Sequence, residues 1–476
     1  MGINIIMPVA IMDGEAFYKS RVLPVNQLIK ETGIDYLGLL CQEGKNNNVA
    51  VYAAVFPFHE NKHSEFLKDN PDCLEITEVE YKAGLKPVTT SLCPDNPKVR
   101  KRLVAAVKEL LEKYPDMAGI SLDYIRYRDD KACFCPYSRE AHAAYAAKNS
   151  NLTETQAVSE FCENSIVSLV KEIRQEMDEV RKSSGIYAYT HPSYANKFPL
   201  NIHAKRASCA VMSDPSFKTP EQTYYAALNL VRGASRFYKN TEAAPMADFA
   251  RGKSVDQLRN EIRIIGKSGA KSIALWSYEA FFGENMAMPQ DAHIKMISEE
   301  LGGKYQPRQA VQPGDMIPQI PSRPNLARGG SFEDDGKSGA LTFSKVEFAD
   351  GGPVGKKCAV LTSGSGIRTE LHPVEPGYYY TISAYVDLPD DGAAKDLFVR
   401  LTFYDKNKNA VYVRTATIVP RTGWQRAWIT RLSPHESGLS GAGVYVGGDI
   451  FSRGQGQIRV DGFKLEKGVL PSVFTE

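Results

Sequence analysis

Short apolar segments alternate with helix-like segments through the first 300 residues, and this alternation constrains the fold more than any other feature. The segments that predict strands are 3–10, 49–58, 118–125, 185–191, 209–214, 243–249 and 272–278. Those with helical periodicity include 97–114, 154–182, 220–236 and 254–267. Buried strands that alternate with amphipathic helices are typical of a parallel sheet. Seven such units predict an α/β fold, a (β/α)8 barrel of the TIM type. The count is one short of eight, and we expect the missing first strand ahead of Ile3.

A proline-rich stretch separates this region from a C-terminal region with a different sequence pattern. Five prolines lie between Lys304 and Asn325, which predicts a stiff, extended linker. Beyond it, strand-like segments such as YYYTISAYV and LFVRLTFYD are separated by turns rich in Gly, Pro and Asp. This pattern favours an all-β sandwich. The predicted organisation is a barrel over 1–304, a linker over 305–323 and a β-sandwich over 324–476.

Composition excludes some classes of partner. The net charge of +2 gives no electrostatic reason to expect nucleic acid. No run of 18 apolar residues is present, so we expect no membrane span. The N-terminus as given lacks the basic region of a signal peptide. Of the eight cysteines, only Cys133 and Cys135 are close. They lack a second CxxC or a His pair, which favours buried or loop thiols over a zinc site.

Polar residues follow several predicted strands, and in a barrel the carboxyl ends of the strands face the active site. They are His59, Asp123 with Tyr124, His191, Asp214, Asp248 and Glu279. Each carboxylate also has a structural alternative. Asp214 precedes Pro215 and fits a turn, and Asp248 fits a helix cap or a salt bridge. Asp123 itself fits a cap on the next segment or a pair with Arg126.

Four segments resemble a family of bacterial glycosyl-hydrolase-like proteins. They are GINIIMPVAIMDGEAFYKSRVLP, VAVYAAVFPFHEN, SLCPDNPKVRKRLVAAVKELLEKYPDMAGISLDYIRY and GAKSIALWSYEAF, which occur in the family's order and extend over about residues 1–300. Such proteins are distantly similar to the α-galactosidase-type barrel superfamily. If the missing strand is counted as the first, the resemblance implies a nucleophile at Asp123 on the fourth strand and an acid/base at Asp214 on the sixth. It also implies a secreted or cell-surface protein.

Glycoside hydrolysis fits this arrangement, because one carboxylate protonates the leaving oxygen and another acts as nucleophile or as base on water. We predict Asp123 as nucleophile or base, Asp214 as acid and Glu279 as the reserve candidate. No cofactor is expected for catalysis. The candidates for sugar contact in the barrel are His59, Tyr124, Arg126, Tyr127, His191, Asp248, Trp276 and Tyr278, with Tyr52 and Tyr189 as further aromatics.

The C-terminal region has its own resemblance, to the jelly-roll carbohydrate-binding modules of polysaccharide hydrolases. It is carried by PNLARGGSFED, PGYYYTISAYV, GWQRAWITRL and IRVDGFKLEKG, within about 324–470. The resemblance implies a structural calcium at Glu333 and Asp461, since calcium takes hard oxygen ligands. Sugar contact would fall to Trp424 and Trp428, with Tyr404 and Tyr412 also to be tested. The alternative is a scaffold that binds no sugar.

Two classes of function therefore stay open. The first is a glycoside hydrolase that cleaves a polysaccharide or exopolysaccharide, with a carbohydrate polymer as partner. The second is a non-catalytic carbohydrate-binding or surface-assembly protein on a degenerate barrel. A shared cleft for Asp123, Asp214 and Glu279 would favour catalysis. A metal-dependent deacetylase is less favoured, because His59, His191 and His203 lack recognisable ligand spacing.

Overall fold

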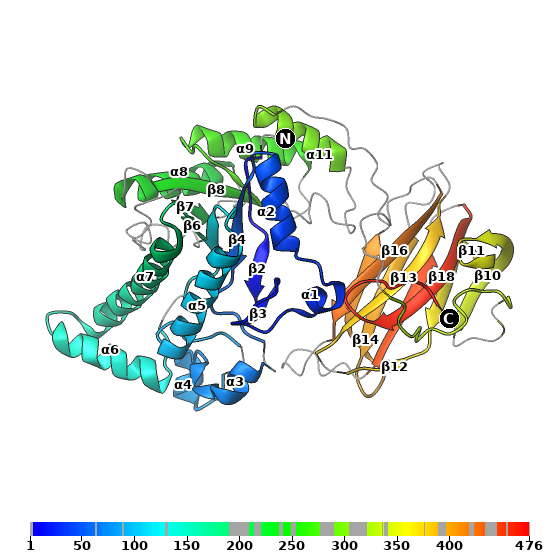
Figure 1. Ribbon diagram of the computed structural model, residues 1–476, viewed down its shortest axis with the longest axis horizontal. Coiled ribbons are helices and arrows are strands. Elements are labelled where there is room, and N and C mark those ends of the chain that lie inside the picture. The colour runs from blue at the N-terminus through cyan, green and yellow to red at the C-terminus, as the bar shows by residue number, and fades with distance from the viewer. Residues whose placement is uncertain are drawn as a thin grey trace. The chain divides into compact units, whose positions relative to one another are not determined.

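The computed structural model divides the chain into two compact units, one made of most of residues 1–305 and the other of residues 306–476 with two short segments from earlier in the chain (Figure 1). The structure describes residues 3–61, 64–87, 90–128, 132–189, 209–213, 220–237, 241–248, 254–276, 290–303, 321–335, 337, 341–375, 377–388, 397–417, 423–433, 445–453 and 456–475. Most of the predicted linker lies outside these residues, so its bounds of 305–323 stay a prediction.

The first unit is built on a sheet whose strands follow one another in chain order. These are β1 (Ile5–Ile6), β2 (Val9–Met12), β3 (Glu15–Ala16), β4 (Ala50–Val55), β5 (Gly119–Leu122), β6 (Gly185–Tyr189), β7 (Cys209–Ser213), β8 (Thr241–Asp248) and β9 (Ala274–Trp276). Their order is β3-β2-β4-β5-β6-β7-β8-β9, with β1 also paired to β4. Every pair is parallel except β2 with β3. The predicted α/β class is confirmed, with all seven predicted strand segments in the expected order.

Helices connect these strands. The larger ones are α2 (Tyr36–Asn46), α5 (Pro97–Lys113), α6 (Pro136–Lys148), α7 (Glu154–Arg181), α8 (Pro220–Phe237), α9 (Val255–Lys267) and α11 (Gln290–Glu300). The shorter ones are α1 (Gln27–Thr32), α3 (Glu65–Asp69), the 3₁₀ turn η1 (Pro71–Cys73) and α4 (Glu78–Ala83). In Figure 1, α5, α7 and α8 follow one another around the sheet in chain order. None of the helices within the described residues combines the length and apolar character needed to cross a bilayer.

Local chemistry explains where the predicted helices begin. The Asn96 side chain accepts a hydrogen bond from the Lys98 amide at 2.9 Å, and Pro97 occupies the first helical position of α5. Ser254 and Gln257 form a reciprocal capping box at the start of α9. Each signal lies within three residues of the helix it starts. These helix positions could therefore be predicted from the sequence alone.

The first hydrophobic core lies between the strands and the helices that cover them. Val55, Ile120 and Leu122 on the strands are fully buried, as are Val107 on α5 and Ile166 on α7. At Gly119, an added Cβ would lie 2.0 Å from the Gly185 carbonyl oxygen on β6. A side chain at Gly119 would therefore push β5 and β6 apart.

The second unit is an antiparallel β-sandwich with its own hydrophobic core. Its strands are β10 (Leu341–Gly352), β11 (Gly355–Thr369), β12 (His372–Pro373), β13 (Tyr379–Asp387), β14 (Leu397–Tyr404), β15 (Ala410–Thr417), β16 (Trp424–Leu432), β17 (Tyr445–Ser452) and β18 (Ile458–Lys467). The order is β15-β14-β17-β11-β18-β13-β16, with β10 on β11 and β12 on β17. Neighbours that are distant in the chain show the crossovers of a jelly roll. The predicted all-β C-terminal sandwich is confirmed.

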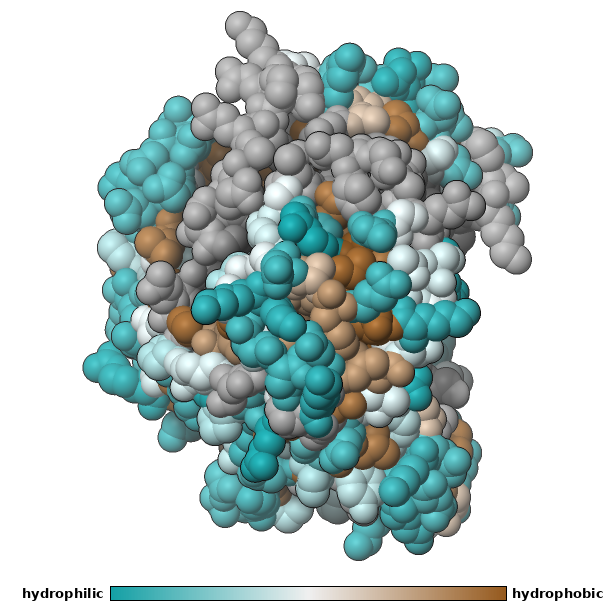
Figure 2. Space-filling view, turned by 90° about the vertical axis from the view of Figure 1, so that its right-hand side faces the viewer, coloured by the Kyte–Doolittle hydropathy of each residue, from teal (hydrophilic) through white to brown (hydrophobic). Residues whose placement is uncertain are grey.

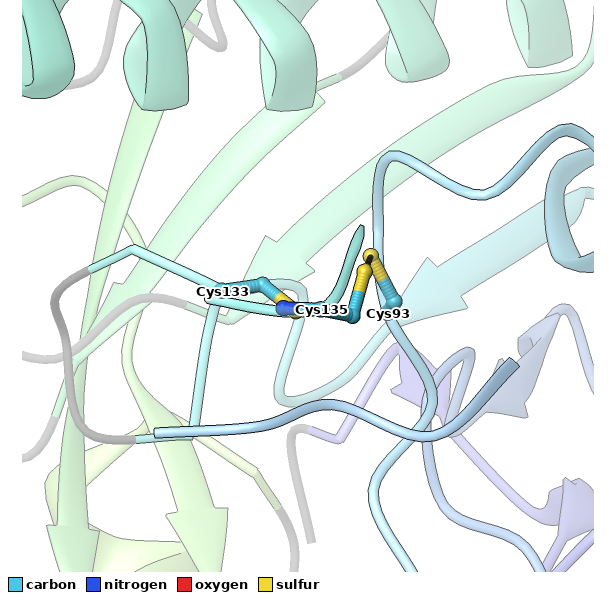
Figure 3. A group of neighbouring side chains, drawn as sticks. All are labelled: Cys93, Cys133 and Cys135. Atoms are coloured by element: carbon cyan, nitrogen blue, oxygen red, sulfur yellow. Dashed lines mark hydrogen bonds between the residues drawn. The ribbon is translucent and has the colours of Figure 1, made fainter. Parts of the chain in front are cut away.

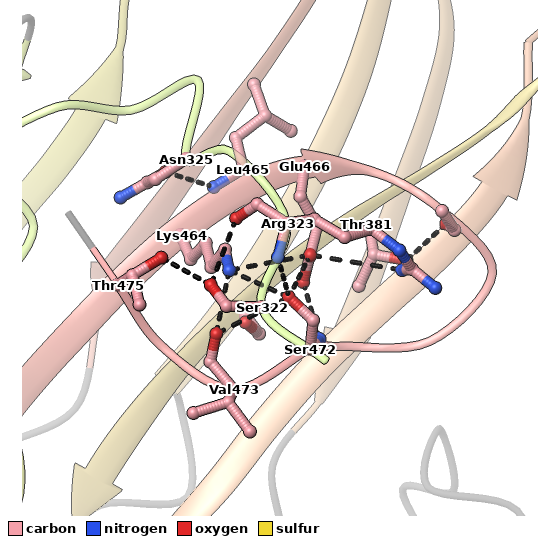
Figure 4. A network of polar contacts seen from close by, with 12 residues as sticks. Ser322, Arg323, Asn325, Thr381, Lys464, Leu465, Glu466, Ser472, Val473 and Thr475 are labelled. Atoms are coloured by element: carbon pink, nitrogen blue, oxygen red, sulfur yellow. Dashed lines mark hydrogen bonds and ion pairs between the residues drawn. The ribbon is translucent and has the colours of Figure 1, made fainter. Parts of the chain in front are cut away.

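A buried polar network joins the beginning and the end of the sandwich (Figure 4). Lys464 and Glu466, both fully buried, form an ion pair with 3.6 Å between Nζ and Oε2. The Lys464 ammonium also donates to the Ser472 hydroxyl at 2.8 Å and the Val473 carbonyl at 2.9 Å. The Arg323 amide donates to the same Ser472 hydroxyl at 3.0 Å. One network thus fastens both ends of the module to β18.

The surface in Figure 2 is mostly hydrophilic, with smaller hydrophobic areas between the polar side chains. In the sandwich, the exposed large apolar or aromatic side chains include Tyr378 and Tyr412. Single exposed aromatics of this kind are normal on a soluble protein surface and do not by themselves mark a binding site.

Candidate active site at the carboxyl ends of the parallel strands

Asp123 directly follows β5 and is almost completely buried. Its backbone amide donates to the Val55 carbonyl of β4 at 2.9 Å, and its Oδ1 accepts from the Tyr124 amide at 2.9 Å. Burial raises the pKa of Asp123 to about 6, against the opposing effects of the Tyr124 amide and the Arg126 charge. The next helix begins only at Pro136, so Asp123 is not a helix cap. It is a buried carboxyl group at a strand end that changes protonation near neutral pH.

Tyr124 lies beside this carboxyl group and reaches solvent. Its φ of +51° is in the left-handed region, which costs a non-glycine residue about 1–3 kcal/mol. The side chain is 40% exposed and stacks on Phe56 with 6.1 Å between ring centroids. The Arg126 guanidinium lies 5.0 Å from the ring centroid. Tyr124 thus places an exposed aromatic ring next to a buried carboxyl group, and its role in sugar contact stays a prediction.

His59 and Asp13 belong to the same edge of the sheet. His59 follows β4, and its ring centroid lies 5.3 Å from that of Tyr124. Its Nδ1 is 4.0 Å from Asp13 Oδ1, at the turn after β2. The pKa of His59 is lowered, mainly by burial and also by the Arg126 charge, and the Asp13 charge opposes this shift. The three neighbouring strands β2, β4 and β5 therefore present Asp13, His59 and Asp123 at their carboxyl ends.

Tyr127 points into the protein. It is buried, and its hydroxyl donates to Asp95 Oδ1 at 2.6 Å. Burial and the neighbouring Asp95 raise the pKa of Tyr127 well above its usual value. Tyr127 therefore anchors the loop that carries Asp123, because its hydroxyl is already engaged inside the protein. Tyr52 is likewise buried and makes an edge-on contact with Tyr187 at 4.6 Å.

Asp95 connects this loop to the helices behind it. Besides Tyr127, its carboxylate accepts from the Ser138 hydroxyl of α6 and the Ser165 hydroxyl of α7, each at 2.5 Å. Asp95 was not among the predicted site residues. The Cys-Pro-Asp-Asn-Pro motif at 93–97 is the sequence signal that marks its position.

Glu60 and Arg102 form a second supporting pair under the site. Their ion pair is buried, and burial raises the pKa of Glu60 while Arg102 lowers it. Arg102 also donates to the Gly14 carbonyl at 3.0 Å. A Cβ on Gly14, whose φ is +72°, would overlap the Glu60 carboxylate. The Glu60–Arg102 pair thus holds the Asp13–Gly14 turn in place. In the sequence, this turn is marked only by the Asp-Gly dipeptide at the end of the strand.

The other predicted barrel residues are located only in part. Asp248 and Trp276 are the last residues of β8 and β9 and are paired in register, and only their backbone is described. The remaining candidates, Asp214, Glu279, His191 and Tyr278, lie outside the described residues. The predicted pairing of Asp123 with Asp214 or Glu279 therefore stays a prediction. A groove of about 970 Å³ runs along α5 and α7, and its lining includes Asp95 but not Asp123.

In the sandwich, Glu333 and Asp461 converge on the turn between β10 and β11. Asp461 is fully buried and its Oδ2 accepts from the Val354 amide at 2.8 Å. Glu333 Oε1 accepts from the Lys357 amide at 2.8 Å. Burial and, to a smaller extent, the charge of Glu333 raise the pKa of Asp461 to about 6, against the opposing effect of the Val354 and Gly462 amides. No ion pair to Asp461 occurs within the described part of the chain, and Glu333 beside it is exposed. That these two carboxylates hold a calcium ion stays a prediction.

We expect calcium to stabilise the protein through this pair. Binding to the folded state alone raises stability by mass action, so EDTA should lower the melting temperature and added calcium should restore it. Asp461→Asn should abolish the response, whereas Asp350→Asn, on the exposed part of β10, should preserve it. Differential scanning calorimetry of the full chain measures both. An identical melting curve with EDTA and with calcium would rule out the calcium site.

The predicted sugar-binding tryptophans lie on β16, the last strand in the sheet order. Both Trp424 and Trp428 are half-buried. The Arg459 guanidinium lies 5.3 Å from the Trp424 ring centroid and forms an ion pair with Asp387. Their role in sugar contact stays a prediction.

Comparisons with solved structures give distant likenesses. Alpha-L-fucosidase isoenzyme 2 from Paenibacillus thiaminolyticus is 16% identical over 63% of this chain and 43% of its own, with a TM-score of 0.46. The β-galactosidase from Bacillus circulans sp. alkalophilus is 12% identical over 58% of this chain and 46% of its own, with a TM-score of 0.42. The CBM22-1 xylan-binding domain from Paenibacillus barcinonensis Xyn10C is 15% identical over 28% of this chain and 89% of its own, with a TM-score of 0.22. This chain thus spans less than half the length of either enzyme.

The family comparison bears on the region that contains Asp123. No curated protein matches the sequence. The family match begins at residue 1 and ends at residue 197. It confirms the resemblance to glycosyl-hydrolase-like proteins for the three motifs within these residues, whereas GAKSIALWSYEAF lies beyond the match. Residues 1–197, which hold strands β1 to β6 and the loop of Asp123, match the family Glycosyl hydrolase-like 10.

Proposed function

We propose that this protein is a glycoside hydrolase that cleaves a polysaccharide, with Asp123 as its nucleophile or water-activating base. The observation that carries the proposal is the position of Asp123. It is a buried carboxyl group at the carboxyl end of a central parallel strand, in the region that matches a glycosyl-hydrolase-like family. Active sites of such barrels lie at this end of the strands.

The neighbouring side chains supply what glycoside cleavage requires. Tyr124 offers an exposed aromatic face, and Arg126 and His59 offer polar groups beside it. A second carboxyl group must protonate the leaving oxygen. We assign this role to Asp214, with Glu279 as the alternative, because both follow strands of the same parallel sheet in the sequence.

We further propose that the sandwich holds the enzyme on its polymer, and that the protein acts outside the cell or at its surface. The direct experiment is digestion of a panel of polysaccharides by the full chain, with release of reducing ends as the readout. Release from one class of polymer supports the proposal. Binding to a polymer without release would favour a non-catalytic carbohydrate-binding protein instead.

Removing the sandwich should affect long substrates more than short ones. The two units have separate hydrophobic cores, so we expect a chain that ends at residue 303 to fold. Tethering raises the effective concentration only where both sites engage one polymer. Activity on insoluble polymer should therefore fall at least about tenfold, while activity on a short oligosaccharide is retained. Equal losses on both substrates would show that the sandwich is structural.

A further inference from the structure

Three buried cysteines from two separate loops meet behind the candidate active site (Figure 3). Cys93 lies ahead of α5, whereas Cys133 and Cys135 precede α6. Their sulfur atoms all lie within 4.8 Å of one another, and Cys135 Sγ is 3.7 Å from Cys93 Sγ. None of the three side chains is more than 1% exposed. The Cys-x-Cys pair in the sequence thus gains a third thiol from about 40 residues upstream.

The spacing of the sulfurs suits a tetrahedral metal ion. A zinc–sulfur bond of about 2.3 Å at the tetrahedral angle separates two sulfur ligands by about 3.8 Å. The observed 3.7 Å between Cys93 and Cys135 agrees with this value. Thiolates are soft ligands and select zinc over the hard cations calcium and magnesium.

Polar groups around the sulfurs are placed as they are around metal-bound thiolates. The Cys135 amide donates to Cys133 Sγ at 3.4 Å, and the Ser138 amide donates to Cys135 Sγ at 3.4 Å. The Ser138 hydroxyl lies 3.1 Å from Cys93 Sγ and 3.5 Å from Cys135 Sγ. The two amides offset the negative charge that sulfur carries when it binds a metal, whereas the Ser138 hydroxyl donates its proton to Asp95.

We infer that Cys93, Cys133 and Cys135 are thiolate ligands of one structural zinc ion. The Ser138 hydroxyl is close enough to fill the fourth position or to hold a water molecule there. Asp95 accepts from this hydroxyl and from Tyr127, so the same network runs from the sulfurs to the loop of Asp123. The ion clamps the loop before α5 to the loop before α6, and it holds the candidate active site in place without entering the reaction.

The metal content of the full chain tests this inference. The protein is purified under reducing conditions from a zinc-supplemented culture, and its zinc is measured by plasma mass spectrometry. We expect about one zinc per chain, because the three thiolates converge on a single tetrahedral position. Cys93→Ser, Cys133→Ser and Cys135→Ser should each lose most of the zinc. Cys41→Ser, at a buried cysteine of α2 outside the cluster, should keep it.

Cobalt binding gives a second readout that does not depend on how the variants fold. Cobalt added to the reduced, metal-free wild-type chain should produce thiolate-to-metal charge-transfer bands in the near ultraviolet and tetrahedral bands in the visible. Zinc should then displace the cobalt. Zinc far below one per chain together with no cobalt bands would overturn the inference. A disulfide between Cys93 and Cys135, or equal zinc loss in Cys41→Ser, would do so too. Bound iron in place of zinc would contradict the identity of the ion.

Discussion

Asp123→Asn is expected to lower the rate of polysaccharide cleavage by about a thousandfold or more, as the loss of an essential catalytic group does. Asparagine keeps the shape of the side chain and still accepts the hydrogen bond from the Tyr124 amide. It lacks the charge that a nucleophile or base requires. The fold should therefore survive while the chemistry is lost.

The same variant should be at least as stable as the wild type at neutral pH. Burial raises the pKa of Asp123 from 3.8 to about 6, so the folded state holds this proton more tightly than the unfolded state. Protonated Asp123 contributes stability below about pH 4, and this contribution is lost as the pH rises through 6. The cost of the ionised form at pH 7 is up to about 3 kcal/mol. Asp123→Asn removes that cost, so its melting temperature should exceed that of the wild type at pH 7 and approach it at pH 4.

Asp116→Asn is the matched control for activity and stability. Asp116 is an exposed aspartate seven positions earlier, and it pairs with Lys45 at the surface. Its replacement should leave activity unchanged and alter stability by less than about 1 kcal/mol. If Asp123→Asn unfolds more easily and its folded fraction keeps full activity, Asp123 has a structural role.

Lys464→Met should destabilise the sandwich by about 3 kcal/mol, because the buried Glu466 then keeps only the longer ion pair with Arg323, at 3.9 Å, and its hydrogen bonds from Ser472. The substitution also removes the hydrogen bonds from Lys464 to Ser472 and Val473. Denaturant unfolding of the full chain, followed by a probe in the sandwich, measures the change.

Lys467→Met provides the control on the same strand. Lys467 pairs with Glu375 near the surface, where the two side chains are 33% and 65% exposed. Solvent screens such a pair, so its loss should cost less than about 1 kcal/mol. Equal effects of the two substitutions would mean that the buried network does not hold the ends of the sandwich together.

The order of the elements could be predicted from the sequence because its signals are local. Apolar runs gave the strands, and caps such as Asn96 and Ser254 gave the starts of helices. The position of Asp123 at a strand end followed from the same pattern. The sandwich was predicted from strands and turns that alternate at short spacing.

The details of the site depend on contacts that no local pattern reveals. The left-handed φ of Tyr124 turns the chain so that this ring reaches solvent while Tyr127 enters the core, and a tyrosine gives no sign of such a φ. Asp95 joins segments up to 70 residues apart in the sequence. Cys93 meets Cys135 only because two loops pack together. Long-range packing of this kind is fixed by the whole fold.

The pH dependence of kcat/KM for wild type and Asp123→Asn tests the central claim most directly, on the polysaccharide that the panel identifies. The account predicts that wild-type activity rises with the ionisation of a group of pKa about 6 on the acidic side of the profile. It predicts that folded Asp123→Asn is nearly inactive at every pH. A folded variant that cleaves the polymer at the wild-type rate, with the same pH profile, would contradict the assignment of Asp123.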